Sequence, residues 1–136
     1  LVPGAVQEFL RHQNTVVYLR HTATRDMEYL GQQIRKGHKL VCILGAPNRD
    51  PALFPDPDAF DITRPIGNTR KNYRTFGQGP HYCVGVHQAR LNLEVMLEAI
   101  VRCMTDFRLL AAPRHARSIF MDGYKEMRVG FARRPA

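Results

Sequence analysis

The chain has 136 residues, of which 44% are hydrophobic and 24% are charged. This balance is typical of a globular protein and excludes a disordered or fibrous one. The length suits one domain that can bury an ordinary core. The net charge of +8 would fit nucleic acid, an acidic partner protein or anionic cofactor groups. Because the basic residues are scattered and no nucleic-acid module accompanies them, we do not expect nucleic-acid binding.

The sequence contains no run of about 18 apolar residues and no charged-then-apolar leader at Leu1. We therefore expect a chain without a membrane span or a targeting signal. Three cysteines at wide spacing are an odd number, which indicates a reducing compartment rather than a disulfide framework. The sequence thus predicts a soluble, cytoplasmic protein in which Cys42 and Cys103 are small core residues.

The first predicted element is a short helix over residues 3–11. Pro3 suits its first turn, and apolar residues at helical spacing give it one buried stripe. Glu8 and Arg11 are three residues apart and so lie on one face, where by themselves they would form a surface ion pair of little energetic value. Residues 15–19 form a β-branched and apolar run that predicts a strand.

Short extended stretches are predicted next, at residues 22–24 and 29–34, around a turn. Residues 40–44 are apolar throughout, which predicts a strand that is covered on both faces. Residues 47–65 contain five prolines and little periodicity, so we expect an irregular but ordered segment there.

The stretch from Phe76 to Gly85 concentrates the chemistry of the chain. Glycines at positions 77, 79 and 85 permit positive φ angles and close passage beside a flat ligand. Cys83 offers a thiolate at the start of the following helix, where the helix dipole and the free N–H groups stabilise an anion. The stretch is therefore predicted to be a ligand-binding loop that leads into a helix.

The longest helical pattern covers residues 84–105. Its predicted core stripe comprises Leu93, Met96, Leu97, Ile100, Val101 and Met104, and its predicted solvated face comprises Arg90, Glu94, Glu98 and Arg102. After residues 107–110, short strands are expected at residues 118–121 and 127–131, joined through Asp122 and Gly123.

Six residues of the loop carry a resemblance to a known family. Phe76, Gly77, Gly79, His81, Cys83 and Gly85 fit the pattern Phe-Gly-x-Gly-x-His-x-Cys-x-Gly, in which the chain resembles the bacterial branch of the cytochrome P-450 superfamily. The resemblance covers nearly the whole chain but only the C-terminal third or so of a family member. It implies that residues 1–136 are the C-terminal haem-binding portion, with the N-terminal part and the oxygen-activating helix absent.

The fold implied by the resemblance is α+β and mainly α. It consists of a short Glu-x-x-Arg helix, small β-sheets, a meander (residues 47–65), the cysteine loop (residues 76–85), a long proximal helix and a C-terminal hairpin. Where the family often has Ala-Arg-x-Glu after the cysteine, this chain has Asn92 in place of Glu. That departure weakens a surface interaction and not the haem assignment.

The resemblance also implies the cofactor, haem b, and its contacts. Cys83 would be the axial ligand of the iron, and its thiolate would favour O–O cleavage. Arg20 and His81 would bind the propionates through charge-assisted hydrogen bonds. The other haem-binding residues would be Phe76, Gly77, Gly85 and Ala89, and a buried ion network would join Glu8, Arg11 and Arg64.

A monooxygenase is the activity implied: it would take electrons from a redox partner and use O2 to hydroxylate an apolar small molecule. The substrate-facing residues would be Val16, Val17, Phe120 and Met121. An acidic ferredoxin would dock on the face that carries Arg70, Lys71, Arg74, His87 and Arg90.

Other interpretations remain open on the sequence. Cys83 with His81 or His87 could form a Cys–His nucleophile pair, although no Asn or Asp orienter is evident. The same three residues could bind zinc, although a fourth ligand at proper spacing is missing. The chain could also be a fragment or a reduced protein that binds haem without monooxygenase activity of its own, or with weak peroxidatic activity.

Overall fold

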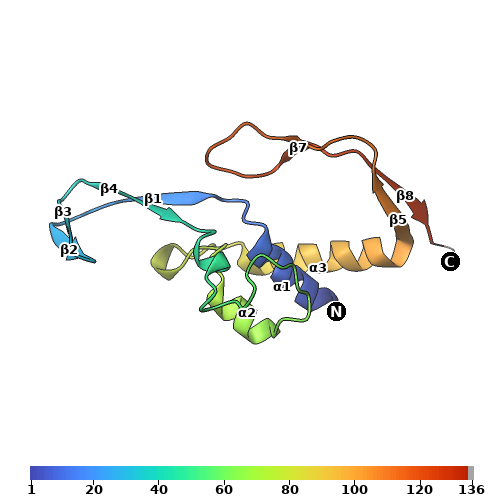
Figure 1. The fold of residues 1–136 in the computed structure, drawn as a ribbon, viewed down its shortest axis with the longest axis horizontal. Helices are drawn as coiled ribbons and strands as arrows, with labels where there is room; N and C mark the ends of the chain where they lie inside the picture. The colour runs from blue at the N-terminus through green and yellow to red at the C-terminus, as the bar shows by residue number, and fades with distance from the viewer. Residues whose placement is uncertain (135–136) are drawn as a thin grey trace.

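The computed structural model describes residues 1–134, and within them helices combine with small two-stranded sheets (Figure 1). The helices are α1 (Val2–His12), α2 (Ile66–Asn72) and α3 (Val86–Cys103), with short 3-10 turns η1 (Pro47–Arg49) and η2 (Gly79–His81). The strands are β1 (Tyr18–Thr22), β2 (Met27–Tyr29), β3 (Gln32–Ile34), β4 (Lys39–Ile43), β5 (Met104–Leu109), β6 (Arg114–His115), β7 (Tyr124–Glu126) and β8 (Val129–Arg133). The predicted α+β class is confirmed.

The strands form antiparallel pairs. β1 pairs with β4, from Tyr18 opposite Ile43 to Thr22 opposite Lys39, and β2 pairs with β3 between them in the chain. β5 pairs with β8, and β6 pairs with β7. In Figure 1 the β1–β4 hairpin extends from one end of the helical body, while β5 and β8 stand at the far end of α3. The helices therefore form the body, and the hairpins extend from it as arms.

The hydrophobic core is small. Val6 and Leu10 of α1 pack with Phe54 and Tyr73 at its centre. The exposed surface measures 10286 Å², against about 7,300 Å² for a typical folded monomer of 15.6 kDa. The prediction of an ordinary core is therefore wrong for this chain, because large apolar side chains of the hairpins and of α3 face solvent.

Helix α1 packs unusually closely against the meander. It begins as predicted, with Pro3 in the first turn, where the helix needs no backbone N–H. A Cβ at Gly4 would lie 2.6 Å from the carbonyl oxygen of Ile62. Glycine at this position thus allows the helix to approach the meander backbone more closely than any other residue would.

Several strand predictions fail in their bounds. The stretch predicted over residues 29–34 is split by a turn into the end of β2 and β3, and the strand predicted over residues 127–131 is β8, which pairs with β5 and not with residues 118–121. The strand predicted over residues 15–19 begins instead at Tyr18, and Val16 makes only an isolated bridge, to Met121. The strand predicted over residues 118–121 is wrong, because that segment consists of bends that end in the same bridge. A single bridge fixes the position of both segments without giving either one a ladder of hydrogen bonds.

Strand β4 matches the prediction in position but not in its surroundings. The prediction that it is covered on both faces is wrong, since β1 is its partner and Val41 and Ile43 are about half exposed. Cys42 in this strand and Cys103 at the end of α3 are exposed too, so their prediction as core residues is also wrong. An apolar run indicates a surface that can be buried, but in residues 1–134 only Leu44, at the end of this run, is buried.

Helix α3 is two residues shorter at each end than the predicted range of 84–105. Leu93 and Leu97 pack on the core, whereas Met96 and Val101 are about half exposed. The stripe is therefore only partly buried, because α1 covers one part of its length. Arg90, predicted on the solvated face, is buried, so that assignment is wrong.

The close approach at Gly4 gives a prediction. We expect Gly4→Ala to lower the free energy of unfolding by about 1–3 kcal/mol, because the new methyl group meets a backbone carbonyl. Gly67 of α2 is the matched control, since a Cβ there meets nothing within 4 Å. Gly67→Ala should instead stabilise the protein by about 0.5–1 kcal/mol through helix propensity. Urea denaturation measures both, and equal effects would contradict the close packing.

Candidate functional site

The cysteine loop is closed by its own backbone. The Cys83 N–H donates to the Phe76 carbonyl at 3.0 Å, and the Gly77 N–H donates to the Arg74 carbonyl at 2.8 Å. Gly77 and Gly79 have φ angles of +73° and +77°, which favour glycine because other residues are strained there. Gly85 does not use this freedom, because it is the N-cap of α3 with φ −82°. Cys83 consequently lies just before the N-terminus of α3.

A cavity of about 570 Å³ lies beside this loop and is lined mostly by apolar side chains. Its walls come from α1, β1, the end of β4, the cysteine loop and α3. The lining residues include Phe9, Leu10, Val16, Leu19, Leu44, Phe76, Gly77, His81, Cys83, Ala89 and Leu93. A thiol, an imidazole and a glycine-rich backbone thus face one apolar space.

Most of the predicted haem-binding residues lie together at this cavity. Phe76, Gly77, His81, Cys83 and Ala89 line it. Arg20 does not: it lies exposed on β1, directly after Leu19, which does line the cavity. Gly85 does not line the cavity but is the N-cap of α3, where a Cβ, if present, would lie 3.8 Å from the Cys83 Sγ.

The four predicted substrate-facing residues also lie side by side. Val16 pairs with Met121 in an isolated bridge, and the Val17 N–H donates to the Phe120 carbonyl at 2.9 Å. The Phe120 ring stands edge-on to Tyr18, with 5.8 Å between their centroids. Val16 alone among the four lines the cavity, while Phe120 and Met121 are about half exposed.

Glu8 and Arg11 form a buried, bidentate ion pair. Arg11 donates from Nε to Glu8 Oε2 at 2.7 Å and from Nη2 to Oε1 at 2.6 Å. The exposed fractions of the two side chains are 0% for Arg11 and 1% for Glu8. Arg11 also donates to the carbonyls of Asn48, Pro57 and Ala59 at 2.8, 2.7 and 2.9 Å. Each of its nitrogens therefore has a partner.

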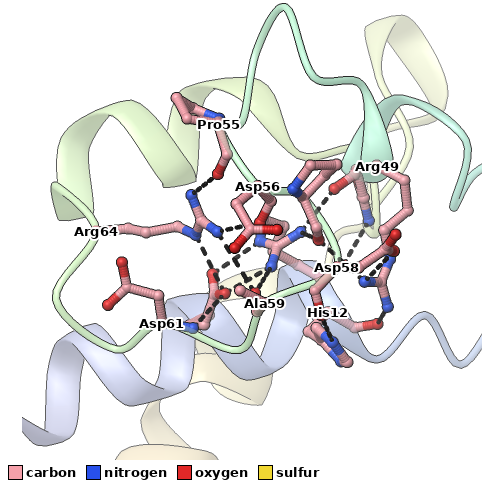
Figure 2. Close-up of polar contacts among 12 residues, drawn as sticks. His12, Arg49, Pro55, Asp56, Asp58, Ala59, Asp61 and Arg64 are labelled. Atoms are coloured by element: carbon pink, nitrogen blue, oxygen red, sulfur yellow. Dashed lines mark hydrogen bonds and ion pairs between the residues drawn. The ribbon is translucent and has the colours of Figure 1, made fainter.

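Arg64 connects this pair to the meander (Figure 2). Its Nε donates to Glu8 Oε1 at 3.2 Å, and its terminal nitrogens donate to the carbonyls of Pro55 and Asp56, each at 2.7 Å. The Asp61 N–H adds a third hydrogen bond to Glu8 Oε1, at 2.9 Å. Glu8, Arg11 and Arg64 are hereafter the ion network.

Asn48 joins the ion network to the cysteine loop. Its side chain is buried, and it donates to the Arg11 carbonyl at 3.2 Å and to Thr75 Oγ1 at 2.9 Å. Its Oδ1 accepts from the Arg74 N–H at 2.6 Å. Thr75 Oγ1 in turn donates to the Leu10 carbonyl at 2.6 Å. The residues that immediately precede Phe76 are thereby held against α1.

The environment of Glu8 sets its protonation. Burial alone would raise its pKa, but hydrogen bonds from Arg11, the Asp61 N–H and Arg64, together with the Arg11 charge, lower this pKa below its ordinary value of 4.5. Charged hydrogen-bond partners outweigh desolvation here. Glu8 is thus a carboxylate at neutral pH.

The basic residues predicted on one docking face differ in how far they are exposed to a docking partner. Arg70, Lys71 and His87 are exposed. Arg74 donates to the carbonyls of Lys71, Asn72 and Tyr73 at 2.9, 2.7 and 3.2 Å, and so caps the end of α2. Arg90 is buried and cannot face a partner, so its assignment to this face is wrong.

Several residues of the site could not be found from the motif. Asn48 lies in a segment without periodicity, and Tyr73 precedes the loop by three positions. Leu19 and Leu44 were predicted only as strand residues, and no spacing rule places them at a cavity wall. The proximity of an Asn and a Tyr to several arginines is a weak signal, and it becomes visible only when the chain is folded.

Two further observations concern other kinds of site. Among residues 1–134 no group of three or more His, Cys, Asp or Glu side chains is arranged to hold a metal ion. Over the same residues, no helix has the length and apolar character needed to cross a membrane.

Comparison with known proteins identifies the family. The chain matches the family Cytochrome P-450 over residues 1–123. It is 44% identical over 108 residues to 20-oxo-5-O-mycaminosyltylactone 23-monooxygenase of Streptomyces fradiae, covering 79% of this chain and 25% of that protein. It is 38% identical over 129 residues to linalool 8-monooxygenase of Pseudomonas putida, covering 95% of this chain and 31% of that protein.

Among solved structures, a cytochrome P-450 from Novosphingobium aromaticivorans matches with a TM-score of 0.88 and 35% identity, over 96% of this chain and 32% of that one. The chain belongs to the cytochrome P-450 family, whose members bind haem b. It spans about a quarter to a third of the length of the curated relatives named above.

The ion network gives a prediction about stability. Glu8→Ala would leave Arg11 and Arg64 as buried charges without their carboxylate, which typically costs about 3–5 kcal/mol of unfolding free energy. Glu126→Ala is the control, because it breaks the exposed pair with Arg114 and should cost less than about 1 kcal/mol. Urea denaturation compares them, and haem retention should fall with Glu8→Ala. Equal, small effects would show that the ion network contributes little.

The same comparison has a pH signature. Because the folded-state pKa of Glu8 is lowered, its contribution is fully present above the ordinary pKa of 4.5 and is lost as the pH falls through the lower folded-state value. The stability difference between the wild type and Glu8→Ala should therefore narrow only below pH 4.5. If the stability difference narrows between pH 7 and 5 instead, the titration of another group causes the pH dependence.

Proposed function

We propose that this protein is a haem-thiolate monooxygenase in which Cys83 is the axial ligand of the haem iron. One observation carries the proposal: the thiol of Cys83, the imidazole of His81 and the ring of Phe76 line the same apolar cavity. The complete cysteine-loop signature and the family membership support it. A thiolate ligand supplies electron density that favours O–O cleavage when the haem is bound.

The residues at the cavity fit this cofactor in three respects. Apolar walls from Leu10, Ala89 and Leu93 suit a flat macrocycle, and the loop glycines allow the backbone to pass beside it. His81, which lines the cavity, is the proposed hydrogen-bond donor to one propionate. Arg20, exposed beside Leu19, is the proposed partner of the other propionate, for which its side chain would extend past the cavity rim.

The roles of the remaining residues follow from their positions. Phe76 is proposed to pack beside the thiolate and the haem ring, and Gly85 to leave room beside the Cys83 sulfur. The ion network holds α1 and the meander against the residues that enter the loop. Val16, Val17, Phe120 and Met121 are the proposed contacts of the substrate. Their apolar side chains favour a hydrophobic small molecule.

Electrons are proposed to come from an acidic ferredoxin. Arg70 and Lys71 at the end of α2 and His87 at the start of α3 are exposed around the cysteine loop. Complementary charge would accelerate the encounter of such a donor with this face. Arg74 is proposed to act by holding the end of α2 in place, because its guanidinium donates to three backbone carbonyls there.

We further propose that residues 1–136 form the C-terminal haem-binding portion of a cytochrome P-450. The second candidate function is haem binding by these residues without monooxygenase activity of their own. The small core and the large exposed apolar surface favour it for the isolated chain.

Haem ligation by Cys83 gives the decisive prediction. The ferrous carbonyl complex of the protein should show the strongly red-shifted Soret band of a thiolate ligand, and Cys83→His should abolish it. The controls are Cys42→Ser and Cys103→Ser, which alter the other two exposed thiols and should leave the band unchanged. A red-shifted band in Cys83→His would overturn the assignment.

The same spectrum and a hydroxylation assay, both performed on residues 1–136 alone, separate the two candidate functions. A red-shifted band without hydroxylation, when a ferredoxin system is supplied, would support the haem-binding role for the isolated chain. Hydroxylation would support the enzyme.

The docking face gives a second functional prediction. Reduction by an acidic ferredoxin should slow as ionic strength rises, because the Debye length is only about 10 Å at 0.1 M salt. Arg70→Glu should slow it further at low salt, and Arg117→Glu, an equal charge change on the segment between β6 and β7, should not. Stopped-flow measurement of the first electron transfer tests this. Equal rates for both variants would place the donor elsewhere.

A further inference from the structure

Arg90 is a buried cation with no carboxylate partner among residues 1–134. It lies in the second turn of α3 with 6% of its surface exposed. The ion pairs of the described chain involve Arg11, Arg49, Arg64, Arg114 and His115, and none includes Arg90. A buried charge without a counter-charge is costly, so its presence calls for a reason.

The hydrogen bonds of Arg90 go to a neutral group. Its Nε and Nη2 donate to the Tyr73 hydroxyl oxygen at 3.1 and 2.6 Å, and that hydroxyl donates to Gln7 Oε1 of α1 at 3.0 Å. Burial raises the pKa of Tyr73, although the hydrogen bond and charge of Arg90 oppose this rise. The phenol thus remains neutral and leaves the positive charge of Arg90 uncompensated.

The guanidinium also packs against the ring that enters the cavity. Arg90 Cζ lies 5.4 Å from the centroid of the Phe76 ring, within the range of a cation–π interaction. Phe76 lines the cavity, and its carbonyl accepts the backbone N–H of Cys83. The charge of Arg90 is therefore one aromatic ring away from the cavity.

We propose that Arg90 is a positioning residue that holds Phe76 in place and keeps an unscreened positive charge beside the cysteine loop, which raises the reduction potential of the bound haem. The inference rests on the proposed haem ligation by Cys83. One electron from the donor removes one positive charge from the iron, so a nearby buried cation favours the reduced state. Because Arg90 is buried, salt does not screen this effect as it would on the surface.

The test is the reduction potential of the haem-loaded protein, produced with any sequence that naturally flanks residues 1–136, and measured by spectroelectrochemistry. Arg90→Gln and Arg90→Met remove the charge, and Met also fills the apolar space. Both should lower the equilibrium constant for reduction by roughly tenfold, the order expected for a buried charge at an effective dielectric constant of about 20. A tenfold change is 59 mV for a one-electron couple.

Three variants act as controls. Arg90→Lys keeps the charge but loses the forked hydrogen bonds, and it should retain most of the potential. Arg102→Gln removes an exposed charge from the same helix and should leave the potential nearly unchanged. Tyr73→Phe, which removes the acceptor but leaves the cation, should likewise not lower the potential as far as Arg90→Gln.

The outcomes are distinct. Equal potentials for Arg90→Gln and Arg102→Gln would overturn the inference. Loss of haem from Arg90→Gln and Arg90→Met, with retention of haem in Arg90→Lys, would also overturn it, because that result indicates a purely structural role. Failure of the proposed haem ligation would be seen separately, as a wild-type ferrous carbonyl spectrum without the thiolate shift.

Discussion

The ion pair between Glu8 and Arg11 is the interaction on which the arrangement of the site depends. Both charges are withdrawn from water, and only the complete set of partners makes this tolerable: Glu8 accepts from two arginines and a backbone N–H, and Arg11 donates to three carbonyls as well. These carbonyls belong to the meander, a segment without regular structure. The network therefore gives an irregular segment one conformation, because any other would leave a buried charge without its hydrogen bonds.

Asn48 transmits that constraint to the cysteine loop. Its four polar contacts join α1, the meander and the residues before Phe76. The loop itself is shaped by local features, namely two left-handed glycines and the hydrogen bond between Cys83 and Phe76. Local geometry therefore decides the shape of the loop, while the buried polar contacts decide where it lies relative to α1 and the cavity.

The sequence predicted the parts that depend on local patterns. The helix that carries Glu8 and Arg11 and the long helix after Cys83 are confirmed within two residues, as is the α+β class. It could not predict the surroundings of those parts. Arg90 fell on a polar helical face by its spacing, but Tyr73 and Phe76, both outside the helix, cover it. The burial expected at Val41, Cys42 and Cys103 failed for the opposite reason, since an apolar pattern does not say what covers it.

The sequence separations within the ion network bear on how the chain folds in time. Arg11 and Asn48 are 37 positions apart, and Glu8 and Arg64 are 56 apart, with both hairpin strands β1 and β4 between them. Closing loops of this length has an entropic cost that grows slowly with length, but it must be met before the buried contacts can form. The cysteine loop and α3, by contrast, are built from neighbouring residues. A full-length chain that refolds would thus form the cysteine loop before it anchors this loop to α1, and the slow step would be the formation of the contacts between α1 and the meander.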